Sequence, residues 1–223
     1  MLVFMSEVGV PEAAHILGVS DARVRQLIAA GDVRARQIAG RWLVDVASLR
    51  SAPRRGRPMS PRIAWALVEL VEGRRAPWLS NEEAYRLRLQ RSRLARDKEP
   101  EILLRSWLAA RAVRHALSAP APAKLLGDPR VVRSGVSDIR SGLSAGHEAE
   151  AYVLADDLEA VRSEHLLVSA DRARANVWLH AAPMLPAAPV PLLLLAADLA
   201  QHDGPRELGR ARDLIVSTLQ ETS

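Results

Sequence analysis

Hydrophobic positions at the start of the chain recur with the spacing of two short helices. Apolar side chains fall on one face of a helix over residues 10–17 and on one face of a second helix from 21 to about 30. Gly18 can turn the chain with a positive φ, Ser20 is a good N-cap for the second helix, and Gly31 ends it. The pattern therefore predicts a helical hairpin.

The spacing of three residues in this hairpin is typical of a helix-turn-helix. Ala14 is small enough for two helices to cross closely, Gly18 lies at the turn, and Val24 supplies an apolar contact that fixes the second helix. Leu17, Val19 and Leu27 occupy further core positions. We therefore expect the second helix to be held firmly against the first.

The other face of the second helix carries side chains suited to a DNA groove. These residues are Asp21, Ala22, Arg23, Arg25 and Gln26. Arginine can donate two hydrogen bonds to guanine, and glutamine can pair with adenine. The alternative is that Arg23 and Arg25 belong to an ordinary solvated face.

A β-hairpin is predicted after the helices. Side chains alternate over residues 33–38 and 41–44, on both sides of the pair Ala39-Gly40. Such a hairpin would be a wing that directs Gln37 and Arg41 toward phosphates, while Trp42 divides its surface between packing and the DNA backbone. Asp45 then caps a short helix over residues 46–50.

These residues resemble the excisionase-like and MerR-like winged helix-turn-helix domains over residues 8–50. The likeness includes the Gly-Val-Ser turn at 18–20 and Gly-Arg-Trp at 40–42. The resemblance implies that Ser20, Arg23, Arg25 and Gln26 enter the major groove and that Arg41 contacts the DNA backbone.

A basic segment follows the hairpin and its helix. Arg54, Arg55 and Arg57 surround Gly56, and Arg-Gly-Arg-Pro resembles the core of an AT-hook. Glycine lets an extended backbone enter a narrow minor groove, where the negative potential attracts arginine. The alternative is a basic linker between domains.

The remainder of the chain reads first as helical and then as mixed. Helices are expected before Gly73, over 80–97 with a Ser80/Glu83 capping box, and over 100–117. The second of these carries five arginines, which either follow phosphates or form a solvated face. Residues from 120 onward predict short elements, with strands at 131–133, 152–154, 166–168 and 177–180 and closing helices over 190–201 and 205–219.

The expected fold is mainly α with small β elements. It comprises an N-terminal winged helix-turn-helix and a larger α+β C-terminal domain. We expect the DNA-binding domain at 1–52, a basic AT-hook-like linker at 53–60, a helical region at 61–118, and an α+β domain for partner binding or dimerisation at 119–223.

The charge balance favours a polyanionic partner for one end of the chain. Residues 1–100 hold 18 Lys and Arg against 11 Asp and Glu, whereas residues 101–223 hold 13 against 15. Double-stranded DNA is the expected partner of the basic end. The start of the chain has no secretory pattern and no apolar stretch is long enough for a bilayer, so we expect a cytoplasmic protein with no membrane contact.

The residues give little sign of catalysis. Cysteine is absent, the six histidines show no ligand spacing, and Ser134-Gly135 resembles the start of a nucleotidyltransferase motif without the carboxylate pair that would hold Mg²⁺. Phosphate-binding glycine motifs are absent too. We expect no catalytic residue, no metal and no cofactor, with a nucleotidyltransferase-type enzyme as the alternative.

Residues 60–215 bear a second, more diffuse resemblance. The segments Ser134–Ser137, Asp156–Leu158 and Asn176–His180 look like parts of AbiEi-like actinobacterial proteins, which are encoded beside nucleotidyltransferase toxins. The resemblance implies an abortive-infection antitoxin that represses its own operon, with a cognate toxin as protein partner and a homodimer on DNA. An excisionase-like factor that bends DNA is the alternative.

Overall fold

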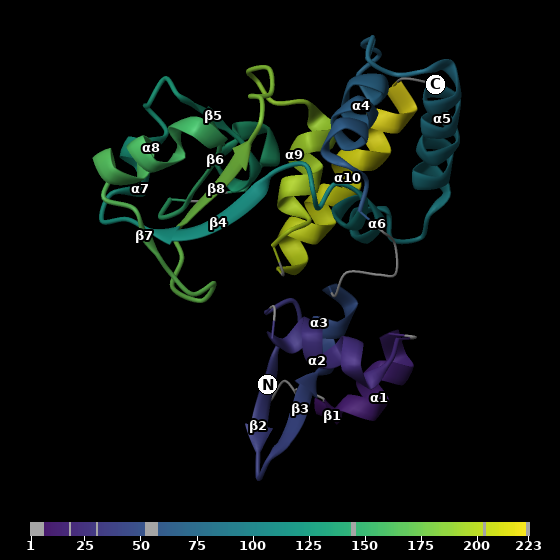
Figure 1. Ribbon diagram of the computed structural model, residues 1–223, viewed down its shortest axis with the longest axis vertical. Helices are drawn as coiled ribbons and strands as arrows, with labels where there is room; N and C mark the ends of the chain where they lie inside the picture. Colours follow the sequence, from purple (N-terminus) through teal and green to yellow (C-terminus); the bar gives the residue numbers. More distant parts are fainter. Residues whose placement is uncertain are drawn as a thin grey trace. The chain divides into compact units, whose positions relative to one another are not determined.

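A computed structural model of the chain describes residues 7–17, 19–29, 31–51, 58–143, 146–202 and 204–221. The chain divides into two compact units, Met1–Arg57 and Pro58–Ser223, which we call the N-terminal unit and the C-terminal unit (Figure 1). Within the described ranges, every helix is too short or too polar to serve as a bilayer span.

The N-terminal unit packs short helices against a small antiparallel sheet. Its elements are β1 (Glu7–Gly9), α1 (Val10–Leu17), α2 (Asp21–Ala29), β2 (Ala35–Ile38), β3 (Arg41–Asp45) and α3 (Val46–Ser51). Strand β3 lies between β1 and β2. The sequence pattern had not predicted β1, because three residues carry too little alternation to be read as a strand.

The two helices meet as the small and apolar residues require. Ala13 and Ala14 of α1 are buried against Val24 and Leu27 of α2, in a core shared with Val44 of β3. The amide of Gly31 donates to Ile28, that of Asp32 donates to Leu27, and Gly31 has φ 73°. This pair of bonds is a Schellman motif, which ends α2 where the sequence predicted.

The C-terminal unit contains a mixed sheet and a group of helices. Its helices are α4 (Pro61–Val71), α5 (Asn81–Arg96), α6 (Pro100–Trp107), α7 (Pro122–Leu125), α8 (Leu158–Glu164), α9 (Leu192–Leu199) and α10 (Pro205–Glu221), with 3₁₀ turns η1 (Gly135–Ser137), η2 (Ile139–Ser141) and η3 (Ala155–Asp157). Its strands are β4 (Val113–Ser118), β5 (Val131–Arg133), β6 (Ala149–Leu154), β7 (Val168–Ser169) and β8 (Val177–Ala182), in the order β5-β6-β8-β4-β7. Strands β6 and β8 run parallel and the other neighbours antiparallel.

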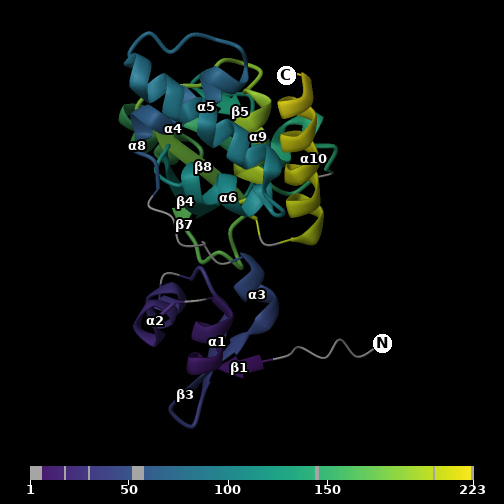
Figure 2. The ribbon, with the colours of Figure 1, turned by 90° about the vertical axis from the view of Figure 1, so that its right-hand side faces the viewer.

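Helices cover both faces of this sheet. One core lies between the sheet and helices α7 and α8, around Leu125, Val161 and Leu179. The larger core joins the other face, through Tyr152 and Ala182, to helices α4, α5, α6, α9 and α10 (Figure 1). Helices α6, α9 and α10 pack side by side within it (Figure 2). Segments from both 61–118 and 119–223 therefore build one core.

The helix predicted over residues 100–117 is wrong beyond its first half. Helix α6 ends at Trp107, and residues 113–118 form β4, which pairs with β8. Between the two elements the chain turns, and the Leu108 carbonyl accepts from the Arg111 amide at 3.1 Å and from the Arg111 side chain at 2.9 Å. Tertiary pairing thus outweighs the helical periodicity that Leu103, Leu104 and Leu108 suggest.

Two other local predictions are confirmed, and two differ in their bounds. The Ser80/Glu83 capping box is confirmed at the start of α5, and the strand at 131–133 is confirmed as β5. The predicted strand at 166–168 is shorter and later, because Leu166 has φ 54° and turns the chain before β7. Helix α9 is likewise shorter than the predicted 190–201.

Candidate nucleic-acid interface

Helix α2 presents two groups of polar side chains on either side of its exposed face. Val24 and Leu27 are buried, whereas Arg23, Arg25 and Gln26 are exposed. At 100° per residue, Arg23 and Gln26 lie on one flank of the exposed face and Arg25 lies on the other. The helix therefore directs its two arginines toward different surroundings.

Arg23 and Gln26 form a pair on one flank. Nη1 of Arg23 donates to Oε1 of Gln26 at 3.3 Å, one turn along the helix. Ser20 precedes them as the N-cap, and its Oγ accepts from the Arg23 amide at 3.3 Å. These three predicted DNA-binding residues are exposed and follow one another along α2 from its N-cap.

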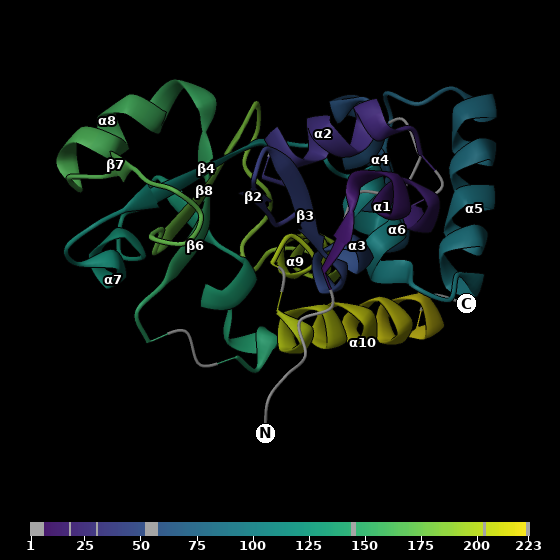
Figure 3. The same cartoon turned by 90° about the horizontal axis from the view of Figure 1, so that it is seen from below.

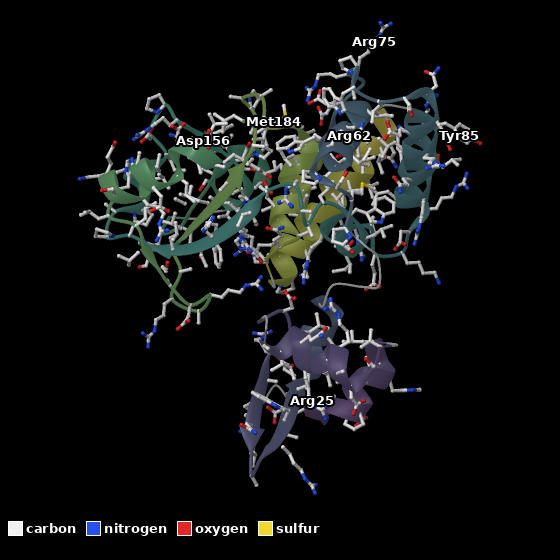
Figure 4. All side chains as sticks on the ribbon, viewed as in Figure 1. Arg25, Arg62, Arg75, Tyr85, Asp156 and Met184 are labelled. Atoms are coloured by element: carbon white, nitrogen blue, oxygen red, sulfur yellow. The ribbon has the colours of Figure 1, made fainter. Side chains whose placement is uncertain are left out.

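Arg25 lies on the other flank beside the hairpin. It lines a groove with Gly40, Arg41 and Trp42 of the hairpin and with the segment 9–11 that begins α1 (Figure 4 labels Arg25). Arg41 is exposed and Trp42 is half-buried against the core of the unit. Two guanidinium groups and an indole thus border a single groove, an arrangement suited to an anionic backbone.

The hairpin separates two residues that were predicted to act together. Ala39 and Gly40 form its turn, with φ of 47° and 78°. Gln37 lies opposite Trp42, and Ile38 lies opposite Arg41, so the alternation of β-strand side chains places Gln37 and Arg41 on opposite faces. Gln37 shares the face of Trp42, which packs against the core.

Acidic partners neutralise some arginines of the unit and leave others free. Arg36 donates two hydrogen bonds to Glu7 of β1, at 2.8 and 2.7 Å, and this contact lowers the pKa of Glu7. Arg34 lies 3.5 Å from Asp45. Among the described residues of the unit, Arg23, Arg25 and Arg41 have no carboxylate partner, so their positive charge is available to a polyanion.

Part of the predicted DNA-binding set lies outside the described residues. These residues are Arg54, Arg55 and Arg57 of the AT-hook-like segment, and the predicted turn residue Gly18 lies outside the described residues as well. The interface described above therefore consists of α2 and the hairpin alone.

The C-terminal unit contains a buried polar cluster that the sequence pattern did not indicate. The cluster joins residues from the sheet, the loops and the end of α9: Arg111, Arg114, Ser134, Glu150, Tyr152, His180, Asp198 and His202. Asp198, fully buried, accepts from the Tyr152 hydroxyl at 2.8 Å and also from Arg111 and Ser134. Glu150, equally buried, lies 2.9 Å from His180 Nε2 and 2.8 Å from His202 Nε2.

The electrostatics of the cluster keep the Glu150 carboxylate charged. Burial would raise the pKa of Glu150, but His202, His180 and Arg114 outweigh burial and hold this pKa well below its ordinary value. Burial lowers the pKa of Arg114 to about 10, and its guanidinium stacks 4.0 Å from the Trp178 ring centre. Arg114 therefore remains a cation at neutral pH.

Gly135 explains the Ser-Gly pair that sequence analysis singled out. It has φ 51°, and a Cβ atom at this position would lie 1.7 Å from Oε2 of Glu150. The Val136 amide donates to that same oxygen at 3.1 Å. The pair thus brings backbone against the Glu150 carboxylate and belongs to the polar cluster.

A comparison with protein families matches the N-terminal unit. A family model described as a helix-turn-helix domain matches residues 8–52. No curated protein and no solved structure matches the chain. The chain therefore contains a helix-turn-helix DNA-binding domain, while the C-terminal unit is interpreted from its own structure.

Proposed function

We propose that this chain is a sequence-specific transcriptional regulator, and more narrowly the antitoxin and autorepressor of an operon that encodes a nucleotidyltransferase toxin. The observation that carries the DNA-binding part is the exposed Arg23–Gln26 pair on α2, flanked by the groove of Arg25 and Arg41. The antitoxin part draws on the resemblance of the C-terminal unit to such proteins.

In this proposal α2 enters the major groove. Arg23 and Gln26 would contact base edges, and each well-formed pair of this kind contributes about 1–3 kcal/mol of discrimination. Arg25 and Arg41 would contact phosphates on the side of the hairpin, and the basic segment at 54–57 would follow the adjacent minor groove. Because one helix contacts few base pairs, two copies would bind a repeated site as a homodimer.

The first experiment measures binding of the full chain to the DNA upstream of its own gene. We expect Arg23→Ala and Gln26→Ala to reduce the preference for this DNA over a shuffled sequence. Arg75→Ala is the matched control, because Arg75 is an exposed arginine of the C-terminal unit. If both α2 variants retain the full preference, this helix does not read the bases.

A second experiment separates phosphate contacts from base contacts. Removing one phosphate contact should reduce the slope of log K against log salt by about 0.9. For Arg25→Gln, the ratio of affinities at 50 and 200 mM salt should therefore fall by a factor of about 3.5. A slope equal to that of the wild type would show that Arg25 faces no phosphate.

The antitoxin part is tested in cells. Expression of the neighbouring reading frame alone should arrest growth, and co-expression of this chain should restore it. An integrase in that place, together with strong DNA bending in a permuted-site assay, would favour the excisionase-like alternative. The proposal assigns no catalysis to the C-terminal unit, and metal-dependent transfer of nucleotides to RNA by the purified chain would contradict that assignment.

A further inference from the structure

The net positive charge of the C-terminal unit comes from helix α5. Residues 58–223 contain 22 basic and 21 acidic side chains, of which α5 contributes five and two. The rest of the unit therefore holds 17 basic against 19 acidic residues. The excess of basic residues belongs to one helix.

This helix lies at the margin of the unit. It packs against α4, α6 and α10 through Leu87 and Leu94, and α7 and α8 lie at the opposite end of the unit (Figure 3). Its other side is exposed along its length. Figure 4 shows Tyr85 on that side, pointing away from the neighbouring helices.

The exposed side has an apolar centre. Tyr85 is 59% exposed and Leu89 is 54% exposed, and they lie four residues apart on the line that points directly away from Leu87. Ser92 and Arg96 continue this line, with spacings of three and four residues. An outward helix face is normally polar, so two large apolar side chains at its centre are unusual. We call the line Tyr85, Leu89, Ser92 and Arg96 the outer stripe.

The arginines of α5 differ in how they are engaged. Arg86 pairs with Glu82, Arg91 donates to the Leu219 carbonyl, and Arg93 lies over the Trp107 ring. Arg88 and Arg96 are exposed, and their guanidinium groups have no partner among the described residues. The guanidinium groups of Arg88 and of Arg96, which belongs to the outer stripe itself, are therefore free to meet an external anion.

We propose that the outer stripe of α5 is the docking surface for a protein partner that offers an apolar pocket surrounded by carboxylates. Tyrosine and arginine are enriched where protein interfaces gain most of their affinity, and charge complementarity directs the encounter. A nucleic acid fits less well, because Leu89 would make no favourable contact with a phosphate. In addition, Glu82 lies one turn from Tyr85 with 72% of its side chain exposed, and its carboxylate would repel phosphates. The inference rests on the proposed function only in requiring a protein partner.

The test places a photo-crosslinking residue, p-benzoylphenylalanine, at position 85 of the full chain in its native cells. The same residue at Ile139, which is 93% exposed and lies in η2, is the control. We expect position 85 to capture a protein that Ile139 does not. Crosslinking to nucleic acid, to a second copy of this chain, or equally at both positions would overturn the proposal.

Affinity measurements on the captured protein, once identified and purified, complete the test. We expect Leu89→Asp and Arg96→Glu each to weaken its binding at least tenfold, and Arg206→Glu, a change at an exposed arginine of α10, to leave it within twofold. Unchanged binding by both α5 variants would overturn the proposal. Binding of the wild-type chain and of the same variants to the upstream DNA is measured in parallel. If the wild-type chain does not bind this DNA, the result contradicts the proposed regulator and leaves the docking surface on α5 untouched.

Discussion

The substitution Asp198→Asn tests whether the buried polar cluster holds the C-terminal unit together. Asp198→Asn preserves the volume of the side chain and removes its charge, so no cavity complicates the result. Asp198 is fully buried, and the Arg111 guanidinium that it balances is 1% exposed. The substitution therefore leaves a buried cation without its counter-charge.

The expected cost follows from these contacts. Breaking one side of a buried ion pair destabilises a protein by about 3–5 kcal/mol. The Tyr152 hydroxyl and the Ser134 hydroxyl also share Asp198, so their losses overlap with that of Arg111 and are not added to it. Because a domain is stable by only about 5–15 kcal/mol, the variant should lose roughly a fifth of its stability or more.

Urea unfolding, followed by tryptophan fluorescence, measures this change, because four of the five tryptophans (Trp65, Trp78, Trp107 and Trp178) lie in the C-terminal unit. Asp156→Asn is the control, because Asp156 is exposed in η3 (Figure 4), and it should change stability by less than about 0.5 kcal/mol. A double variant with Arg111→Met should recover part of the loss, since it removes the unpaired cation. A loss below about 1 kcal/mol for Asp198→Asn would refute the reasoning.

Three further predictions concern single residues. The folded-state pKa of Glu150 lies below its ordinary 4.5, so the stabilising effect of Glu150 is present above that pH and disappears on acidification. Glu150→Gln should therefore flatten the fall in unfolding free energy between about pH 5 and pH 3. An unchanged acid slope would contradict this prediction. Gly40→Ala should cost about 1–2 kcal/mol in urea unfolding of the chain in which the other four tryptophans are replaced by phenylalanine, so that Trp42 alone reports. Gly40 has φ 78° and space for a Cβ atom, so the cost comes from backbone strain alone. A neutral effect would mean that the turn relaxes. Ser80→Ala should cost about 1 kcal/mol in thermal unfolding by removing the capping box of α5, and Ser80→Asn should retain most of that stability.

Local chemistry explains which elements could be predicted from the sequence. The ends of α2 and the start of α5 depend on Gly31 and on Ser80 with Glu83, residues that act on backbone within a few positions. Strand β4 depends instead on pairing with β8 more than sixty residues later, and its own pattern suggested a helix. Sequence reasoning succeeds where a signal and its effect lie within one turn.

The DNA-binding face of α2 could be predicted from the sequence, whereas the buried polar cluster of the C-terminal unit could not. The exposed residues of α2 follow from helical periodicity, and the structure adds that Arg25 lines a groove with Arg41 and Trp42 of the hairpin. The histidines looked scattered because His180 and His202 meet only at Glu150, on a different strand. No spacing along the chain encodes that meeting, since three separate elements bring the groups together.

The sharing of Asp198 by three donors has an evolutionary consequence. A chain that replaced Asp198 first would carry the stranded Arg111 cation until a second substitution arrived, and one that replaced Arg111 first would strand the carboxylate. Each single step crosses a fitness valley, whereas a joint replacement by apolar residues does not. Among descendants of a common ancestor, positions 111, 134, 152 and 198 should therefore covary as one character.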